Sequence, residues 1–95
     1  MEIVFVEYKV FPEKRDAYLS WVKQIRFQHP RMTHYEASDQ ASLFVELWLN
    51  VGEEEYRSFK TARLHNPAAP WSELAEFVPG GLEKVHVWHF RSTRV

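Results

Sequence analysis

The segment SLFVELWLN, residues 42–50, restricts the possible folds of this chain more than any other. Successive side chains of a β-strand point to opposite faces of the sheet, and this segment separates cleanly at that period. One face would carry Leu43, Val45, Leu47 and Leu49, and the other Phe44, Glu46, Trp48 and Asn50. A strand with one purely apolar face needs a second layer to cover it, so we expect helices to pack on the leucine-rich face.

Three other segments are rich in β-branched and aromatic residues and are predicted to be strands: Glu2–Val10, Met32–Ala37 and Lys84–Ser92. The first resembles the segment above, because Val4, Val6 and Val10 share one face. The second alternates only weakly, which is typical of an edge strand. We expect the valine face of the first strand and the leucine face of residues 42–50 to meet the same helices.

Two helices are predicted between these strands. Pro12 suits the first turn of a helix, where its missing N–H group is not needed, and apolar residues then recur at helical spacing until Pro30. The acidic run Glu53–Glu55 favours the start of a second helix, because carboxylates stabilise the N-terminal end. His65–Pro70 interrupts this helix, and Trp71–Phe77 is predicted to be a short helical segment.

The predicted order is therefore β-α-β-β-α-β, which is the ferredoxin-like α+β fold with helices on one face of an antiparallel sheet. Strands one and three are expected to be central. A length of 95 residues allows one domain, residues 1–95. A chain this short with no cysteine lacks disulfide or thiolate-metal support, and such domains are often stabilised by oligomerisation.

Charge and hydropathy exclude several function classes. Twelve basic and 13 acidic residues are nearly balanced, so the chain shows no electrostatic footprint for nucleic acid or an anionic membrane. The one basic cluster, Arg91 and Arg94, is expected to be solvated. The sequence has no apolar run of membrane-spanning length and no signal-peptide pattern, so a cytoplasmic location is expected.

The segment VHVWHF, residues 85–90, places two histidines three residues apart. In a strand these side chains lie on opposite faces, so His86 and His89 cannot share a metal ion, and no metal site is predicted. Val85 and Val87 match the apolar faces of the other strands. His86 is therefore expected on the opposite face beside Trp88, where Glu7 is the carboxylate most expected to lie next to it. His89 is expected on the helix side or at its margin.

That second face of the sheet is expected to be aromatic with embedded ionisable groups. Its predicted members are Phe5, Glu7, Phe44, Glu46, Trp48, His86, Trp88 and Phe90, together with His34 and Glu36 from the edge strand. Aromatic rings would not be needed on a solvated face, and carboxylates would not be tolerated in a plain core. Either two copies of the chain pack through this face, or the dimer also encloses a pocket with acid–base groups and tryptophan walls.

The element order, the length and the segment Phe44–Leu74 resemble the dimeric α/β-barrel superfamily, especially antibiotic biosynthesis monooxygenase-like domains. The resemblance implies a homodimer whose two sheets form a barrel. It also implies a hydrophobic aromatic ligand, bound either between sheet and helices or inside the barrel. An activity it implies is cofactor-independent monooxygenation, in which a base and hydrogen-bond donors act on an electron-rich substrate.

On this resemblance the candidate catalytic residues are Glu7, His86 and Glu46. The candidate substrate-binding residues are Phe5, His34, Phe44, Trp48, Trp88 and His65. The heme-degrading branch of the superfamily carries an asparagine, a tryptophan and a histidine at positions that correspond here to Glu7, Phe59 and roughly Ala69. Heme is therefore not expected as a cofactor, although His65 remains a possible axial ligand.

Two other functions stay open at this point. A non-catalytic dimeric module with the same fold, associated with binding or stress, would have a filled barrel. A heme-binding protein would show heme absorption on titration. An enclosed cavity that reaches Glu7 or His86 would favour the oxygenase.

Overall fold

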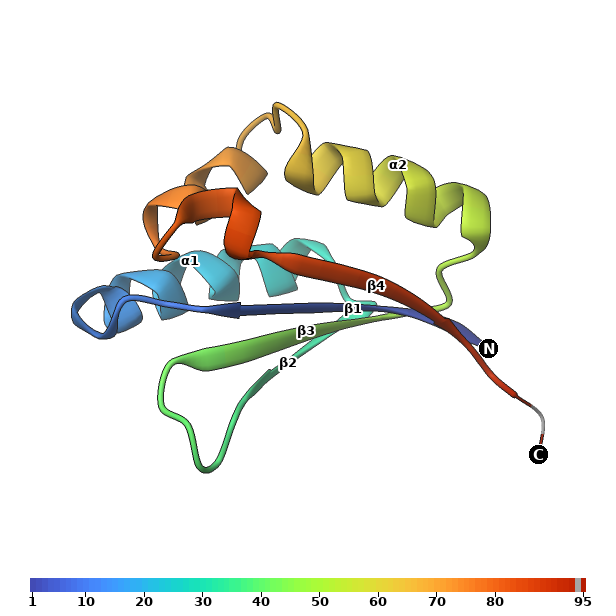
Figure 1. Ribbon diagram of the computed structural model, residues 1–95, viewed down its shortest axis with the longest axis horizontal. Coiled ribbons are helices and arrows are strands. Elements are labelled where there is room, and N and C mark those ends of the chain that lie inside the picture. The colour runs from blue at the N-terminus through green and yellow to red at the C-terminus, as the bar shows by residue number, and fades with distance from the viewer. Residues whose placement is uncertain (94) are drawn as a thin grey trace.

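The computed structural model describes residues 1–93 and 95, and within them it has one four-stranded antiparallel sheet whose helices all lie on one side (Figure 1). The strands are β1 (Glu2–Lys9), β2 (Met32–Glu36), β3 (Leu43–Leu49) and β4 (His86–Arg91). Their order in the sheet is β2-β3-β1-β4, so the prediction that strands one and three are central is confirmed. The ferredoxin-like α+β fold is confirmed with it.

Two α-helices and three 3-10 helices connect the strands. They are η1 (Pro12–Lys14), α1 (Arg15–Gln28), α2 (Glu53–Leu64), η2 (Trp71–Glu76) and η3 (Gly81–Lys84). Pro12 begins the first helical turn as predicted, and α1 buries Tyr18, Val22 and Ile25 against the sheet. No helix in the described part of the chain is long and apolar enough to cross a membrane.

The register of the central strands decides which side chains meet the helices. Val6 lies opposite Glu46 on β3 and opposite Val87 on β4, and paired residues of an antiparallel sheet share a face. Since Val6 is fully buried under the helices, Glu46 and Val87 are buried on the same side. The face of β3 that meets the helices is therefore the one that carries Phe44, Glu46 and Trp48.

The prediction for β3 is thus wrong. Its leucine-rich face is turned away from the helices, and Phe44, Glu46 and Trp48 are 1%, 1% and 4% exposed. His34 and Glu36 were also expected on the far face, but they pair with Glu46 and Phe44 and lie on the helix side. The physical reason is that a cation from α2 compensates the charge of Glu46, so a carboxylate is tolerated in the interior.

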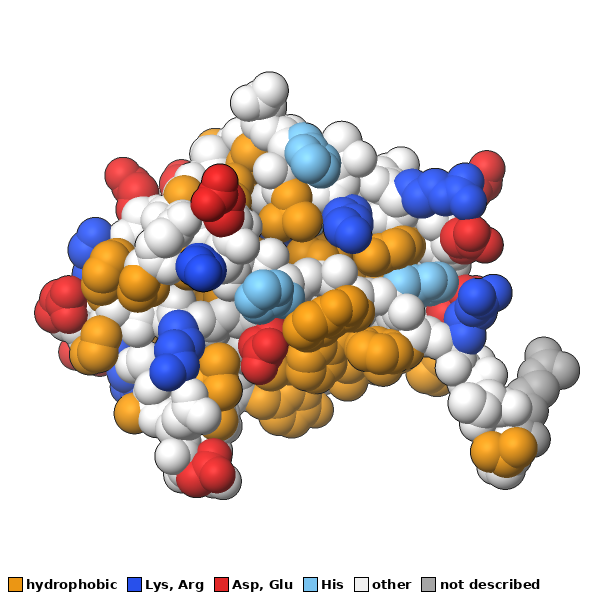
Figure 2. All heavy atoms as spheres, in the orientation of Figure 1, with side chains coloured by type: hydrophobic (Ala, Val, Ile, Leu, Met, Phe, Trp, Pro, Cys, Tyr) orange, Lys and Arg blue, Asp and Glu red, His pale blue; other side chains and the backbone are white. Residues whose placement is uncertain are grey.

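The face without helices, here called the open face, is largely apolar. Figure 2 shows hydrophobic side chains gathered beneath the strands of Figure 1. Trp88, Phe90 and Tyr35 are 42%, 48% and 55% exposed there. The same face carries Phe5 and Glu7 of β1, His86 of β4 and the leucine-rich face of β3. Arg91 is exposed as expected, and Arg94 lies outside the described residues.

The two histidines of β4 point to opposite faces, as predicted. His86 is exposed on the open face, directly opposite Glu7. His89 lies on the helix side, where its Nε2 is 2.9 Å from the carbonyl oxygen of Val51 and its ring stacks on Tyr56. The alternation of side chains along a β-strand was therefore enough to predict that His86 and His89 lie on opposite faces of the sheet.

Candidate functional site

An ion pair between Glu46 of β3 and Arg63 of α2 occupies the layer between sheet and helices. Nη1 of Arg63 donates to Oε1 of Glu46 at 2.7 Å, and Nη2 donates to Oε2 at 2.9 Å. Both side chains are only 1% exposed. Two parallel hydrogen bonds to a carboxylate form the geometry that suits a guanidinium best, so the pair holds α2 in a defined position over the sheet.

The carboxylate of Glu46 also accepts bonds from two ring groups. Nε1 of Trp48 donates to Oε1 at 2.9 Å, and the hydroxyl of Tyr8 donates to Oε2 at 2.6 Å. Burial alone would raise the pKa of Glu46, but the charge of Arg63 and these hydrogen bonds outweigh it, so the pKa lies below its ordinary value. Glu46 is therefore an ionised carboxylate that accepts four hydrogen bonds. In this state, without a bound ligand, it is a poor general base.

A line of hydrogen bonds continues from Tyr8 toward the edge of the sheet. The hydroxyl oxygens of Tyr8 and Tyr18 are 2.6 Å apart, and that of Tyr18 is 2.7 Å from Nε2 of His34. Burial, and next the charge of Glu46, raise the pKa values of both tyrosines, so they stay protonated. Burial lowers the pKa of His34, so its imidazole is neutral near pH 7.

A small cleft opens beside the ion pair, between α2, η2 and the end of α1. Its volume is about 180 Å³, and its lining consists of His29, Arg31, Trp48, Glu55, Phe59, Ala62, Arg63 and Trp71. The ring centroids of Trp48 and Trp71 are 6.0 Å apart, and those of His29 and Trp48 5.3 Å. We call this space the Trp48–Trp71 cleft.

Arg63 is the polar floor of this cleft. The carbon of its guanidinium lies 4.2 Å from the centre of the Trp71 ring, a distance at which a cation and an indole attract each other. Its Nε, although fully buried, has no hydrogen-bond partner among residues 1–93 and 95. A buried donor without an acceptor is costly and uncommon, so this N–H group suits an acceptor that the protein itself does not supply, and such an acceptor reaches it only when the side chains around it are displaced.

A second ion pair forms part of the lining of the cleft. Arg31, which follows α1, binds Glu55 of α2 and also donates from Nη1 to the carbonyl oxygen of Asn50 at 2.9 Å. The two side chains are about half exposed, at 45% and 49%. An exposed pair of this kind contributes little to stability and opens easily. The aromatic cleft therefore has a polar and movable rim.

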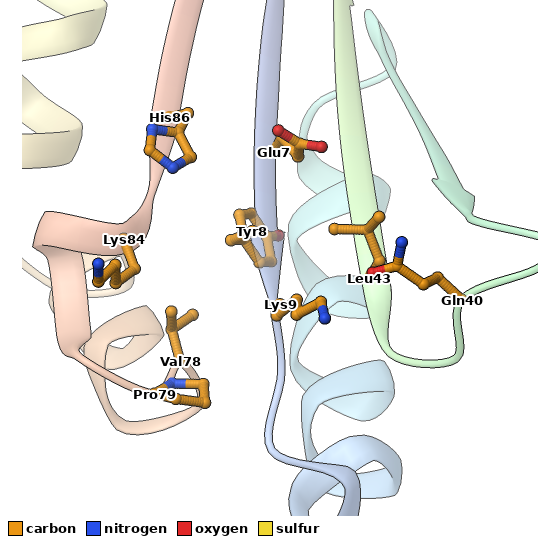
Figure 3. A pocket seen from close by; sticks show the side chains of 9 residues that line it. All are labelled: Glu7, Tyr8, Lys9, Gln40, Leu43, Val78, Pro79, Lys84 and His86. Atoms are coloured by element: carbon orange, nitrogen blue, oxygen red, sulfur yellow. The ribbon is translucent and has the colours of Figure 1, made fainter.

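A larger hollow, of about 410 Å³, lies at one end of the open face (Figure 3). Glu7 and His86 extend into it from neighbouring strands, and Lys9 and Lys84 lie beside it, with Tyr8, Gln40, Leu43, Val78 and Pro79 completing its lining. The expectation that Glu7 and His86 are neighbours is confirmed by their register. We call this space the Glu7–His86 hollow.

The predicted site residues therefore separate into two groups. Phe5, Glu7, His86 and Trp88 lie on the open face, whereas His34, Phe44, Glu46 and Trp48 lie between sheet and helices. The proposed single site that contained both groups does not exist within one chain. His65 follows α2, where its backbone N–H donates to the carbonyl oxygen of Thr61, and its side chain is exposed outside the cleft.

Several residues of the interior site were not among the predicted site residues. They are Tyr8, Tyr18, His29, Arg31, Glu55, Phe59, Ala62, Arg63 and Trp71. A signal for Arg63 was present in the sequence, because it continues the apolar spacing of Tyr56 and Phe59 and so occupies a core position of α2. A cation at a core position requires a buried anion, and Glu46 was the one acidic residue within β3. In the described part of the chain no cluster of three or more histidine and acidic side chains could hold a metal ion.

Comparisons with known proteins bear on the fold. No protein-family model matches the chain, and no curated protein sequence matches it. A solved structure from Nitrosomonas europaea, provisionally named an antibiotic biosynthesis monooxygenase, superimposes with a TM-score of 0.66 at 14% identity. The match covers 98% of this chain and 99% of that protein. The chain therefore has the fold of an antibiotic biosynthesis monooxygenase-like domain, as the sequence resemblance implied.

Proposed function

We propose that the protein binds a small hydroxylated aromatic molecule in the Trp48–Trp71 cleft, with the ligand oxygen at Nε of Arg63. The unpartnered buried Nε–H of Arg63 carries this proposal. Aromatic rings at ring-stacking distances form the walls, and the positive charge of Arg63 favours an oxygen that is ionised.

The size of the cleft supports a ligand with a single ring. Its volume of about 180 Å³ is little larger than the ~150 Å³ cavity that accommodates benzene in an engineered protein, and smaller than the ~300 Å³ at which drug-sized sites begin. Heme is much larger than this. His65, the candidate axial ligand, lies outside the cleft, so the Trp48–Trp71 cleft does not fit heme.

The activity that we propose for this site is cofactor-independent monooxygenation of a 1,4-dihydroxyarene. Deprotonation gives an electron-rich anion, and reaction with O₂ places one oxygen atom on the ring and releases the other as water. The substrate supplies the electrons, so a hydroquinone and O₂ give a hydroxyquinone and water. Arg63 would stabilise the anion, and the aromatic walls would exclude bulk water. The fold likeness to a provisionally named monooxygenase supports this class of reaction.

We also propose that the chain is a homodimer that pairs through its open face. Aromatic and aliphatic side chains from all four strands are uncovered there. Contiguous apolar patches of more than about 300–600 Å² are unusual on monomers. A second copy of the same face offers matching apolar surface, and it would cover the Glu7–His86 hollow. An enclosed hollow of this kind is the alternative location for an aromatic ligand.

Titration with 4-nitrophenol, followed by tryptophan fluorescence, tests the binding site. Ala62→Phe fills the cleft and leaves both members of the Glu46–Arg63 pair in the sequence, and we expect it to abolish quenching. Thr61→Phe adds the same ring at the neighbouring exposed position of α2 outside the cleft and is expected to bind like the wild type. Loss of binding in His86→Phe, with binding retained in Ala62→Phe, would move the site to the open face.

Oxygen consumption with hydroquinone tests the chemistry separately. We expect uptake by the wild type and by Thr61→Phe, and none above the spontaneous rate by Ala62→Phe. Binding without enzymatic oxygen uptake would reject the oxygenase and identify a non-catalytic binding module. Absence of binding would reject the proposed function altogether.

A further inference from the structure

The hydrogen bonds between Glu46 and His34 have a single direction. Glu46 is ionised and only accepts, so the hydroxyl hydrogen of Tyr8 points to Oε2. The Tyr8 hydroxyl has no second hydrogen to donate. In its 2.6 Å contact with the Tyr18 hydroxyl, Tyr18 is therefore the donor and Tyr8 the acceptor. By the same count, the 2.7 Å contact between Tyr18 and His34 needs a hydrogen on Nε2 of His34. The neutral imidazole therefore carries its proton on Nε2 and leaves Nδ1 free.

This line has a second arrangement that keeps every hydrogen bond. If Nδ1 of His34 takes a proton from solvent, the hydrogen on Nε2 can pass to Tyr18, that of Tyr18 to Tyr8, and that of Tyr8 to Oε2 of Glu46. His34 is then neutral with its hydrogen on Nδ1, Glu46 is a neutral acid, and the three contacts remain with donors and acceptors exchanged. One proton has moved from the half-buried imidazole to the interior, and no heavy atom needs to leave its place.

We propose that His34, Tyr18 and Tyr8 are positioning residues that deliver a proton to Glu46 when an anion binds at Arg63 in the Trp48–Trp71 cleft. This inference rests on the proposed function. At rest, Arg63 and Glu46 neutralise each other in a buried site. A bound oxyanion would leave an excess negative charge there, which a medium of low dielectric strongly opposes. Protonation of Glu46 restores neutrality, because Arg63 then has the ligand oxygen as its anionic partner.

The surroundings of His34 suit a group that passes a proton on and does not stay protonated itself. Burial is the largest influence and lowers its pKa. The charged groups that act on it are Glu46 from β3, Glu36 from its own strand and Arg26 from α1. Glu36 is itself engaged by Arg15 of α1, with Nη2 to Oε1 at 2.5 Å and Nε to Oε2 at 3.1 Å. Phe44 stacks on the imidazole ring and Tyr18 holds Nε2, so the ring is fixed in the orientation that the path requires.

The test uses the full chain labelled with nitrogen-15 in histidine, with 4-nitrophenol at a pH where this probe is already ionised. Without the probe, we expect His34 to carry its proton on Nε2. Saturation with the probe should move it to Nδ1. Calorimetry in two buffers of different ionisation heat should show uptake of one proton per bound anion. Tyr18→Phe breaks the line, so it should abolish the shift in tautomer and weaken binding of the ionised probe, because Glu46 can no longer be neutralised.

Two further variants make the result decisive. Tyr56→Phe removes a hydroxyl that contacts the carbonyl oxygen of Val87 at 3.4 Å outside the path, and it should retain the tautomer shift. If Tyr18→Phe does not fold, His34→Gln at the half-buried end of the path should bind the probe with reduced proton uptake. In the wild-type chain, binding without proton uptake or with an unchanged His34 tautomer overturns this inference and leaves the proposed function standing. Absence of any fluorescence change overturns both.

Discussion

The helix-covered face of the sheet contains a charged pair, two tyrosine hydroxyls and an imidazole near its centre, whereas the centre of the open face is built from aliphatic and aromatic side chains. In an ordinary two-layer domain the distribution is reversed. The difference teaches that burial here follows hydrogen-bond satisfaction and not hydropathy. The polar side chains are inside because they are hydrogen-bonded to one another, with the Nε–H of Arg63 as an exception. The apolar side chains of the open face are not covered by a second layer of the same chain.

Replacing one member of the interior pair should have the largest effect. Glu46→Leu leaves Arg63 buried without an anion, and we expect a loss of about 3–5 kcal/mol in the free energy of unfolding. The double variant Glu46→Leu, Arg63→Met removes both charges and should recover most of this loss. Chemical denaturation of the wild type, of Glu46→Leu and Arg63→Met alone, and of the double variant measures the coupling.

A pair of the same type on the same helix provides the control. Arg57 donates to Glu53 at 2.9 Å, but these side chains are 72% and 60% exposed. We expect Arg57→Ala to cost no more than about 0.5 kcal/mol, because solvent screens an exposed pair. Equal costs for the two pairs would contradict the contrast between interior and surface.

A charge at the centre of the open face should act on assembly and leave the fold intact. Leu47→Asp would bury an unpaired carboxylate in the proposed dimer interface, and we expect association to weaken by about 2–5 kcal/mol. Sedimentation velocity measures the change. Phe27→Asp, at a position of α1 that is 87% exposed, should leave the dimer unchanged. A wild-type chain that sediments only as a monomer would reject the dimer.

The smallest effect should come from the pH dependence at His34. Its pKa is lowered from 6.5, chiefly by burial, so the unfolded chain binds more protons than the folded one in this range. Its contribution to stability is therefore complete above about pH 6.5 and declines as the pH falls through the lowered value. His34→Gln should flatten the decline between about pH 7 and pH 5 in denaturation experiments. A steeper decline in the variant would reverse the assigned sign.

The fold was predictable because its signals are local. The alternation in β3, the proline at Pro12 and the acidic first turn of α2 each indicate one element, and their order permits few topologies. The orientation of β3 was not predictable from hydropathy, because both of its faces contain large apolar residues. What decides it is the bond from Arg63 to Glu46, which joins residues from two separate elements.

The interior site was predictable only in part for the same reason. Glu46, Trp48 and His34 were identified as chemically unusual residues of strands, and this remains a sound observation. Their partners Tyr8 and Tyr18 were not among the predicted site residues, since a tyrosine in a hydrophobic pattern shows no sign of its hydroxyl contacts. The aromatic cleft depends on His29 and Trp71, which lie in the segments that follow α1 and α2 and carry no periodic pattern.

The Glu46–Arg63 pair also limits how this chain can diverge. A single substitution that removes either charge is expected to give an unstable intermediate, whereas the doubly substituted chain is expected to recover most of the stability. Substitution at position 46 is therefore expected to follow, or be followed by, substitution at position 63 within a short evolutionary interval. Tyr8, which holds the same carboxylate, should be released from constraint once both charges are gone. Tyr8, Glu46 and Arg63, which lie in two strands and one helix, are therefore expected to change together during evolution.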